Sequence, residues 1–186
     1  MTQARMIRAK LAVPVSEDRD HIRGPRIAPV TLLEYGDYEC QYCGQAYYVL
    51  KELEQRAGNL MKFVFRNFPL TTVHPHAERA AEAAEAAGAQ GKFWEMHDLL
   101  YENQQALEDE DLMKYAAWAG LDINRFVRDL REGRYLIRIR EDFLSGTRSG
   151  VNGTPTFFIN GFRHDGSWDL ITLMTAIEEA AGGRRR

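Results

Sequence analysis

The stretch that decides the fold reads Val30-Thr31-Leu32-Leu33-Glu34-Tyr35-Gly36-Asp37-Tyr38-Glu39-Cys40-Gln41-Tyr42-Cys43. It opens as an apolar run with a β-branched start and stops at a glycine, which predicts a buried strand. The chain's two cysteines follow directly, at the head of a helical pattern. Three residues apart at a helix start, their Cβ atoms lie within roughly 5–6 Å, close enough to form a disulfide with little backbone movement. The pair can therefore cycle between dithiol and disulfide.

A helix and a second strand are predicted after the cysteines. Apolar residues recur at three- and four-residue spacing from Tyr42 to Gly58, the pattern of an amphipathic helix of about four turns. Residues 61–66 then alternate toward Phe68-Pro69, where proline ends the strand. The segment from Val30 to Phe68 is therefore predicted to be a βαβ unit.

The rest of the chain predicts a helical block followed by a ββα unit. Ala- and Leu-rich periodicity between 71 and 150 indicates helices only, with Asp122 as one cap. Strands at 155–159 and 162–164 flank Asn160-Gly161, the strongest short signal for a two-residue hairpin turn. Ser167 is expected to cap a last helix from Trp168 to Ala181. The predicted fold class is α/β, with βαβ and ββα halves on a mixed sheet and an inserted all-helical subdomain.

Length and composition limit the organisation of the chain. At 186 residues it is long enough for one domain with an insert but hardly for two full-size domains. The expected division is an N-terminal arm at 1–28 with one edge strand, a core domain at 29–70 and 151–182, the inserted subdomain at 71–150, and a basic tail at 183–186.

Composition and cysteine usage also limit the partners and the compartment. An apolar fraction of 45%, a charged fraction of 27% and a formal charge of -3 favour no polyanionic partner, so we expect no nucleic acid. Neither a secretory signal nor an apolar run of roughly 20 residues is visible, so we expect no membrane insertion. Both thiols lie in one motif and none remains for a structural disulfide, as in reducing compartments. The expected location is cytoplasmic.

Three segments carry a family resemblance: residues 34–43 quoted above, Phe65-Arg66-Asn67-Phe68-Pro69-Leu70, and Gly150-Val151-Asn152-Gly153-Thr154-Pro155-Thr156-Phe157-Phe158. Together they resemble the DsbA-like branch of the thioredoxin superfamily, over roughly 28–181, and its cytoplasmic or membrane-tethered bacterial members in particular. The resemblance implies a thioredoxin fold with a helical insert and a thiol-disulfide oxidoreductase. Its expected substrates are protein or low-molecular-weight thiols and disulfides, with a redox recycling partner. No metal or other cofactor is implied, and glutathione is a candidate reductant.

The expected chemistry is thiol-disulfide exchange through Cys40, with Cys43 as the resolving thiol. Cys40 would face the unpaired N–H groups and positive end of a helix, which lowers the pKa of its thiol. The backbone N–H of Tyr42 and Cys43 itself could add hydrogen bonds. Asp37 and Glu39 would oppose the thiolate if they are ionised and near. The sequence does not rank these two effects.

Other residues are expected to tune the site or contact the client. Gln41 stands where relatives carry proline and adds an N–H, so the redox potential is not carried over from them. The resemblance implies a cis peptide bond at Thr154-Pro155, which would face Cys40 and offer main-chain hydrogen bonds to an extended client. The predicted apolar groove comprises Tyr42, Phe68, Pro69 and Thr154.

Alternatives to exchange remain open at this point. A zinc site within the chain would need His74 and His76 beside the cysteines, but their spacing is unlike that of zinc ligands, and we expect a helix-entry cap with two exposed imidazoles. The same scaffold also serves glutathione-dependent transferases and isomerases, which usually lack the second cysteine, so Cys43 favours exchange. A third possibility is a redox-sensing or interaction module, with a metal shared between chains.

Overall fold

The computed structural model describes residues 8–182, so the expected basic tail at 183–186 and the first seven residues of the expected arm lie outside it. Five strands form one mixed sheet in the order β1-β3-β2-β4-β5. Its strands are β1 (His21–Arg23), β2 (Val30–Gly36), β3 (Met61–Asn67), β4 (Thr156–Ile159) and β5 (Phe162–Arg163). The β2–β3 pair is parallel and the other three are antiparallel, which confirms the predicted βαβ and ββα halves.

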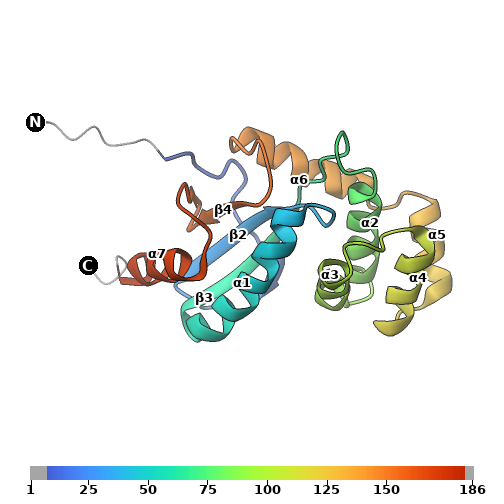
Figure 1. The fold of residues 1–186 in the computed structure, drawn as a ribbon, viewed down its shortest axis with the longest axis horizontal. Coiled ribbons are helices and arrows are strands. Elements are labelled where there is room, and N and C mark those ends of the chain that lie inside the picture. The colour runs from blue at the N-terminus through green and yellow to red at the C-terminus, as the bar shows by residue number, and fades with distance from the viewer. Residues whose placement is uncertain (1–7, 183–186) are drawn as a thin grey trace, which may run out of the picture.

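Helices complete the predicted α/β fold. They are α1 (Gln41–Ala57), α2 (Ala77–Gly88), α3 (Phe93–Glu102), α4 (Asp109–Trp118), α5 (Ile123–Arg131), α6 (Leu136–Arg148) and α7 (Leu170–Gly182), with the 3-10 turn η1 (Gly58–Leu60) after α1. Helices α2 to α6 are inserted between β3 and β4, and α2 to α5 gather beside the sheet in Figure 1. The thioredoxin fold with a helical insert is therefore confirmed.

Alternation along β2 assigns its side chains to two faces of the sheet. Val30 and Leu32 belong to the larger core, which includes the buried faces of α1 and α7 and the inserted helices. Leu33 and Tyr35 belong to a smaller core on the other face, where Phe143 of α6 packs. Glu34 therefore faces the same side as α1 and its cysteines.

Several local signals in the sequence identify their turns and caps correctly. The hairpin between β4 and β5 turns at Asn160 and Gly161, with φ of 49° and 84°, as a type I′ turn requires. Asp122 accepts from the backbone N–H of Arg125 at 3.0 Å and caps α5. At α7 the prediction was wrong, because Asp169 rather than Ser167 accepts from a first-turn amide, that of Thr172.

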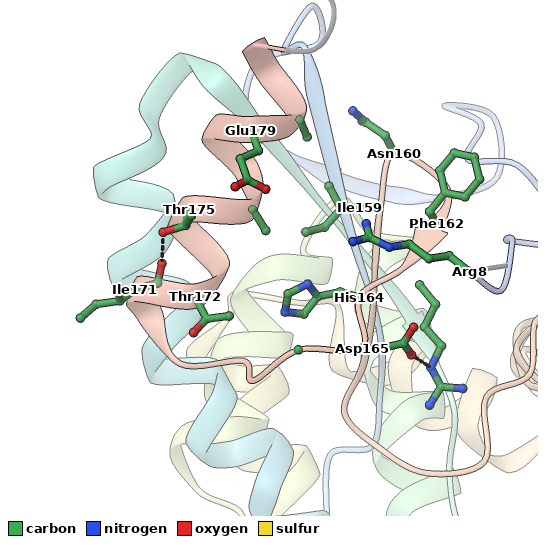
Figure 2. A pocket seen from close by; sticks show the side chains of 14 residues that line it. Arg8, Ile159, Asn160, Phe162, His164, Asp165, Ile171, Thr172, Thr175 and Glu179 are labelled. Atoms are coloured by element: carbon green, nitrogen blue, oxygen red, sulfur yellow. Dashed lines mark hydrogen bonds and ion pairs between the residues drawn. The ribbon is translucent and has the colours of Figure 1, made fainter. Parts of the chain in front are cut away.

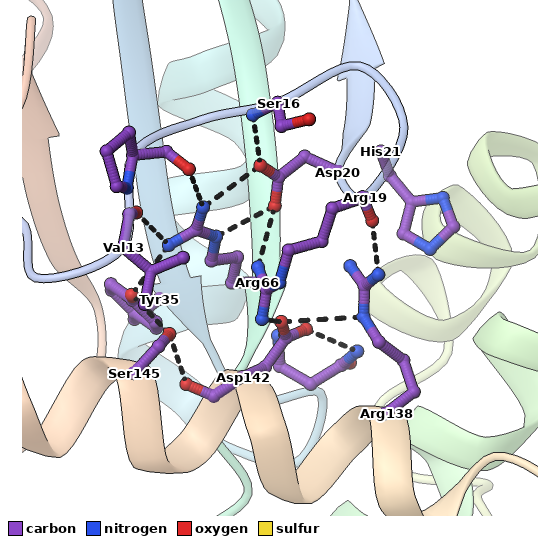
Figure 3. A network of polar contacts seen from close by, with 12 residues as sticks. Val13, Ser16, Arg19, Asp20, His21, Tyr35, Arg66, Arg138, Asp142 and Ser145 are labelled. Carbon is purple, nitrogen blue, oxygen red and sulfur yellow. Dashed lines mark hydrogen bonds and ion pairs between the residues drawn. The ribbon is translucent and has the colours of Figure 1, made fainter.

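The segment before β2 packs on the sheet through a buried ion pair (Figure 3). Arg66 of β3 is fully buried and donates to both carboxylate oxygens of Asp20, at 2.8 and 2.9 Å. Its other hydrogens reach the carbonyls of Val13 and Pro14 and the hydroxyl of Tyr35. The expected edge strand is β1, which pairs with β3. The guanidinium of Arg66 thus links the N-terminal segment to the sheet.

Candidate active site

Cys40 and Cys43 lie at the start of α1, just after the turn that connects it to β2. Cys40 is the N-cap residue, with extended φ and ψ of -70° and 119°, and Cys43 is in the first turn. Both are free thiols, with 4% of Cys40 and none of Cys43 exposed. The structure therefore shows the dithiol form, with Cys43 fully shielded as the sequence predicts.

The Cys40 thiol is strongly acidified. A hydrogen bond from the Cys43 side chain lowers the pKa most; burial opposes it, and the Thr154 side chain and the backbone N–H groups of Cys43 and Tyr42 lower it further. The pKa falls from an ordinary 9.0 to about 5. The expected direction and the expected backbone donors are both present, so Cys40 is a thiolate at neutral pH.

Cys43 is shifted the opposite way. Burial raises its pKa well above the ordinary value, and the hydrogen bond to Cys40 and the charge of Glu34 raise it further. It therefore holds its proton while Cys40 is ionised. The two thiols are thus divided into one nucleophile and one proton-bearing donor.

Glu34 is a residue that the sequence analysis left unassigned. Only 1% of it is exposed, and burial followed by the negative charge of Cys40 raises its pKa to about 8. Its Oε1 has no hydrogen-bond partner among residues 8–182. A lone carboxylate in an otherwise uncharged strand was the signal available for it. A buried carboxyl with this pKa can exchange a proton near neutral pH.

Asp37 organises the turn that carries Cys40. Its Oδ1 accepts from the backbone N–H of Glu39 at 2.8 Å and of Cys40 at 3.2 Å. Its Oδ2 accepts from the backbone N–H of Leu70, and His74 Nδ1 lies 2.8 Å away. The pKa of His74 is raised: burial opposes the shift, but the hydrogen bond and charge of Asp37 and the charge of Cys40 outweigh it.

Glu39 is likewise paired with a histidine. Its oxygens accept from the backbone N–H of His76 at 2.6 Å and from Nδ1 at 2.8 Å, while Nε2 lies 3.0 Å from Glu108. The hydrogen bond to Glu39 is the main reason that the pKa of His76 is raised. His76 is the N-cap residue of α2, at the helix entry as expected, but its side chain caps no amide. The expectation of two exposed imidazoles was wrong, because His74 and His76 are half-buried and pair with carboxylates. The raised pKa of each histidine favours its imidazolium form, which places positive charge beside the two carboxylates that were expected to oppose the Cys40 thiolate.

The loop before β4 approaches the nucleophile. Cys40 Sγ lies 3.4 Å from the carbonyl oxygen of Thr154, which accepts from the thiol form. The Thr154 hydroxyl has no hydrogen-bond partner among the described residues and contributes to the lowered pKa of Cys40, so it is available to the thiolate form. The Thr154–Pro155 peptide bond is cis in the structure. The structure thus brings the two predicted elements together at one sulfur.

The predicted groove residues do not all lie on the surface. Tyr42 is 54% exposed, and Gln41 beside it is also exposed. Phe68 is only 2% exposed, because its ring stacks on Phe143 with centroids 4.3 Å apart. Its assignment to the groove was therefore wrong. Pro69 is buried too, but it borders a hollow of about 370 Å³ that includes neither Tyr42 nor Thr154 in its lining.

Neither cysteine lines a second hollow, which Figure 2 shows. It has a volume of about 880 Å³ and lies between β5 and α7, lined among others by Phe162, His164, Thr172 and Glu179. No predicted site residue lines it. Within residues 8–182 no three His, Cys, Asp or Glu side chains group as metal ligands.

Comparison with known families agrees with this geometry. Residues 16–179 match the family model described as Thioredoxin. The chain belongs to the thioredoxin family. Among curated relatives of this thioredoxin-family chain, Na(+)/H(+) antiporter NhaA 1 of Salinispora arenicola is 53% identical over 175 residues. That match takes in 94% of the chain but 27% of the relative, so the chain spans about a quarter of that protein's length.

Solved structures show the same arrangement as this member of the thioredoxin family. A thioredoxin-like oxidoreductase from Silicibacter pomeroyi DSS-3 has a TM-score of 0.78 and 26% identity, covering 88% of this chain and 93% of that one. BdbD from Bacillus subtilis has a TM-score of 0.81 and 21% identity, covering 95% and 98%. The DsbA-like form of the thioredoxin fold is thus shown. No helix within residues 8–182 combines the length and apolarity needed to cross a membrane.

Proposed function

We propose that this thioredoxin-family chain is a thiol-disulfide oxidoreductase in which Cys40 is the nucleophile and Cys43 the resolving thiol. The observation that carries the proposal is the contrast within the pair: the pKa of Cys40 is lowered to about 5, whereas that of the adjoining Cys43 is raised. Exchange needs one thiolate ready at neutral pH and a second thiol held in reserve. A similar fold in an oxidoreductase supports the same activity.

In the first step the Cys40 thiolate attacks one sulfur of a client disulfide. A bond forms between Cys40 Sγ and that sulfur, the client S–S bond breaks, and the other client sulfur leaves as a thiolate. Cys40 loses its negative charge in the mixed disulfide. Since that charge contributes to the raised pKa of Glu34, Glu34 then ionises more readily.

In the second step Cys43 resolves the mixed disulfide. Ionised Glu34 accepts the proton of Cys43, and the new thiolate attacks Cys40 Sγ. The Cys40–Cys43 disulfide forms, the client sulfur leaves as a thiolate, and the client is reduced by two electrons. Run in reverse, the same steps oxidise a client dithiol and return the chain to its dithiol form.

The acidity of Cys40 favours this oxidising direction. With a pKa of about 5, ionisation at neutral pH stabilises the dithiol by roughly 2.7 kcal/mol relative to a neutral pair, which raises the reduction potential by roughly 60 mV. A stabilised dithiol makes the disulfide form the better oxidant. We therefore propose that clients are protein or small-molecule dithiols and that a separate partner reoxidises the pair. A cytoplasmic location remains a prediction.

The test combines a redox titration with two variants. The cysteine pair is equilibrated against glutathione buffers, and we expect a potential above that of thioredoxin. Cys40→Ala should abolish exchange, and Cys43→Ala should accumulate mixed disulfides that a reductant releases. Unchanged turnover in the Cys40 variant would overturn the assignment. Glutathione conjugation that survives Cys43→Ser would instead indicate a transferase.

A further inference from the structure

A side chain from the helical insert holds the backbone of the cysteine turn. Gln104 lies in the loop between α3 and α4, more than sixty residues along the chain from the cysteines. Its Nε2 donates to the carbonyl oxygen of Tyr38 at 2.8 Å and to that of Cys40 at 2.9 Å. Both hydrogens of the amide are thus used on the turn that carries the nucleophile.

Gly44 makes room for this amide. A Cβ added at this residue would lie 1.9 Å from Gln104 Oε1, far inside contact distance. The backbone N–H of Gly44 donates to the same Cys40 carbonyl at 3.0 Å. Gln104 therefore packs on the first turn of α1 and shares the acceptor of its first helical hydrogen bond.

Neighbouring contacts hold the same segment along α1. Glu102 accepts from the hydroxyl of Tyr47 at 2.8 Å and from Lys51 Nζ at 3.0 Å, three and seven residues after Gly44. These positions follow one face of the helix. The end of α3 is thereby fastened to α1, and Gln104 reaches the reactive end of the same face.

We propose that Gln104 is a positioning residue for the Cys40 thiolate. It does not touch the sulfur, but it fixes the carbonyls on either side of Glu39 and so the direction of the first turn of α1. That turn supplies the backbone N–H groups of Tyr42 and Cys43 that stabilise the thiolate. The inference rests on the proposed function and deepens it, since it makes the reactivity of Cys40 depend on how the helical insert is seated.

The first test measures Cys40 reactivity without any disulfide substrate. In Gln104→Ala we expect a tenfold smaller fraction of Cys40 thiolate below about pH 5. Because a thiolate of higher pKa is also more nucleophilic, iodoacetamide should alkylate Cys40 only about threefold more slowly. The ultraviolet thiolate absorbance should titrate at a higher pH. Gln104→Glu, which replaces the donor with an acceptor and adds negative charge, should shift it further. The control is Gln105→Ala, an exposed neighbour that should change nothing.

A double variant separates positioning from general structure. Gly44→Ala should displace the Gln104 amide while favouring the helix, so it should reproduce the threefold slowing without loss of stability. Gly44→Ala/Gln104→Ala should again be about threefold slower, whereas independent effects would multiply to about ninefold. A ninefold loss, or a destabilised Gln104→Ala with a wild-type titration, would overturn the inference.

The same measurements distinguish the inference from the proposed function. A wild-type protein that exchanges no disulfide, but whose thiolate titration still moves in Gln104→Ala, would refute the oxidoreductase and support the positioning role. Normal exchange with an unmoved titration would refute the positioning role alone.

Discussion

Glu34 is a carboxyl buried in the core on the face of β2 toward α1, where its charge raises the pKa of the Cys43 thiol, and its burial has a cost in stability. The raised pKa means that ionising Glu34 is unfavourable in the folded protein, so this cost grows as the pH rises from the ordinary value of 4.5 toward about 8. No partner among the described residues compensates its Oε1. A group that is costly for folding and interacts through its charge with both reacting sulfurs is better explained by proton transfer than by packing.

Glu34→Gln should therefore slow exchange while sparing stability. Without the proton acceptor for Cys43, resolution of the mixed disulfide should fall about a hundredfold, the lower range for a general base. The free energy of unfolding should be unchanged or higher, with the larger gain near pH 8. Stopped-flow release of a mixed-disulfide client and urea unfolding at two pH values measure the two effects. Alkylation of Cys40 is the internal control, and resolution at the wild-type rate would contradict the role.

The turn between β2 and α1 is held by a side chain that accepts hydrogen bonds from its backbone N–H groups. Cys40 occupies the cap position, and the backbone N–H groups of Tyr42 and Cys43 stabilise its thiolate. Asp37 accepts from the N–H groups just before the helix and also reaches the loop after β3 through Leu70 and His74. The parallel strands β2 and β3 thus end at a shared carboxylate, which fixes the helix entry on which Cys40 depends.

Asp37→Ala should destabilise the protein by about 2–4 kcal/mol, because three buried or half-buried backbone N–H groups and His74 lose their acceptor. Asp37→Asn, which keeps one acceptor oxygen, should lose less. Guanidinium unfolding of the reduced protein measures both. A loss below about 1 kcal/mol in the alanine variant would show that water replaces these bonds.

Local patterns predicted the elements but not the contacts between them. The strand before Cys40, the Asn160-Gly161 hairpin and the Asp122 cap follow from neighbouring residues, and the structure confirms them. Helix α3 ends at Glu102, and the loop that follows it brings Gln104 to the carbonyl of Cys40. That contact, and the burial of Phe68 under α6, join segments far apart in the sequence, which no periodicity encodes.

Across the whole molecule, one buried guanidinium joins the N-terminal segment to the sheet. All five hydrogens of Arg66 are used, on Asp20, two carbonyls and one hydroxyl. Burial opposes ionisation of Asp20, yet the hydrogen bond and charge of Arg66 lower its pKa overall. The pair is therefore ionised at neutral pH and contributes stability above the ordinary value of 3.8, which is lost as the pH falls through the lower folded value.

Arg66→Met should cost about 3–5 kcal/mol near neutral pH, because it leaves the buried charge of Asp20 with only Arg19 and the backbone N–H of Ser16 as partners among the described residues. The double variant with Asp20→Leu should recover part of this loss but not all, since the carbonyls of Val13 and Pro14 still lack donors. Urea unfolding at pH 7 and below about pH 4 measures both. The deficit of the single variant should shrink in acid, and a deficit independent of pH would show that lost packing, not charge, sets the cost.

The stability of the reduced protein should also report the ionisation of Cys40. Because the folded pKa is lowered from 9.0 to about 5, the stabilisation is complete above 9.0 and is lost as the pH falls through about 5. Between about pH 5 and 7, below the pKa of Glu34, we compare the free energies of unfolding of the reduced wild type and of Cys40→Ser. The difference in favour of the wild type should grow by about 1.4 kcal/mol per pH unit. Urea unfolding under a non-thiol reductant measures it. A difference that stays flat across this window would mean that Cys40 is protonated at neutral pH, and the oxidising direction proposed for the pair would lose its physical basis.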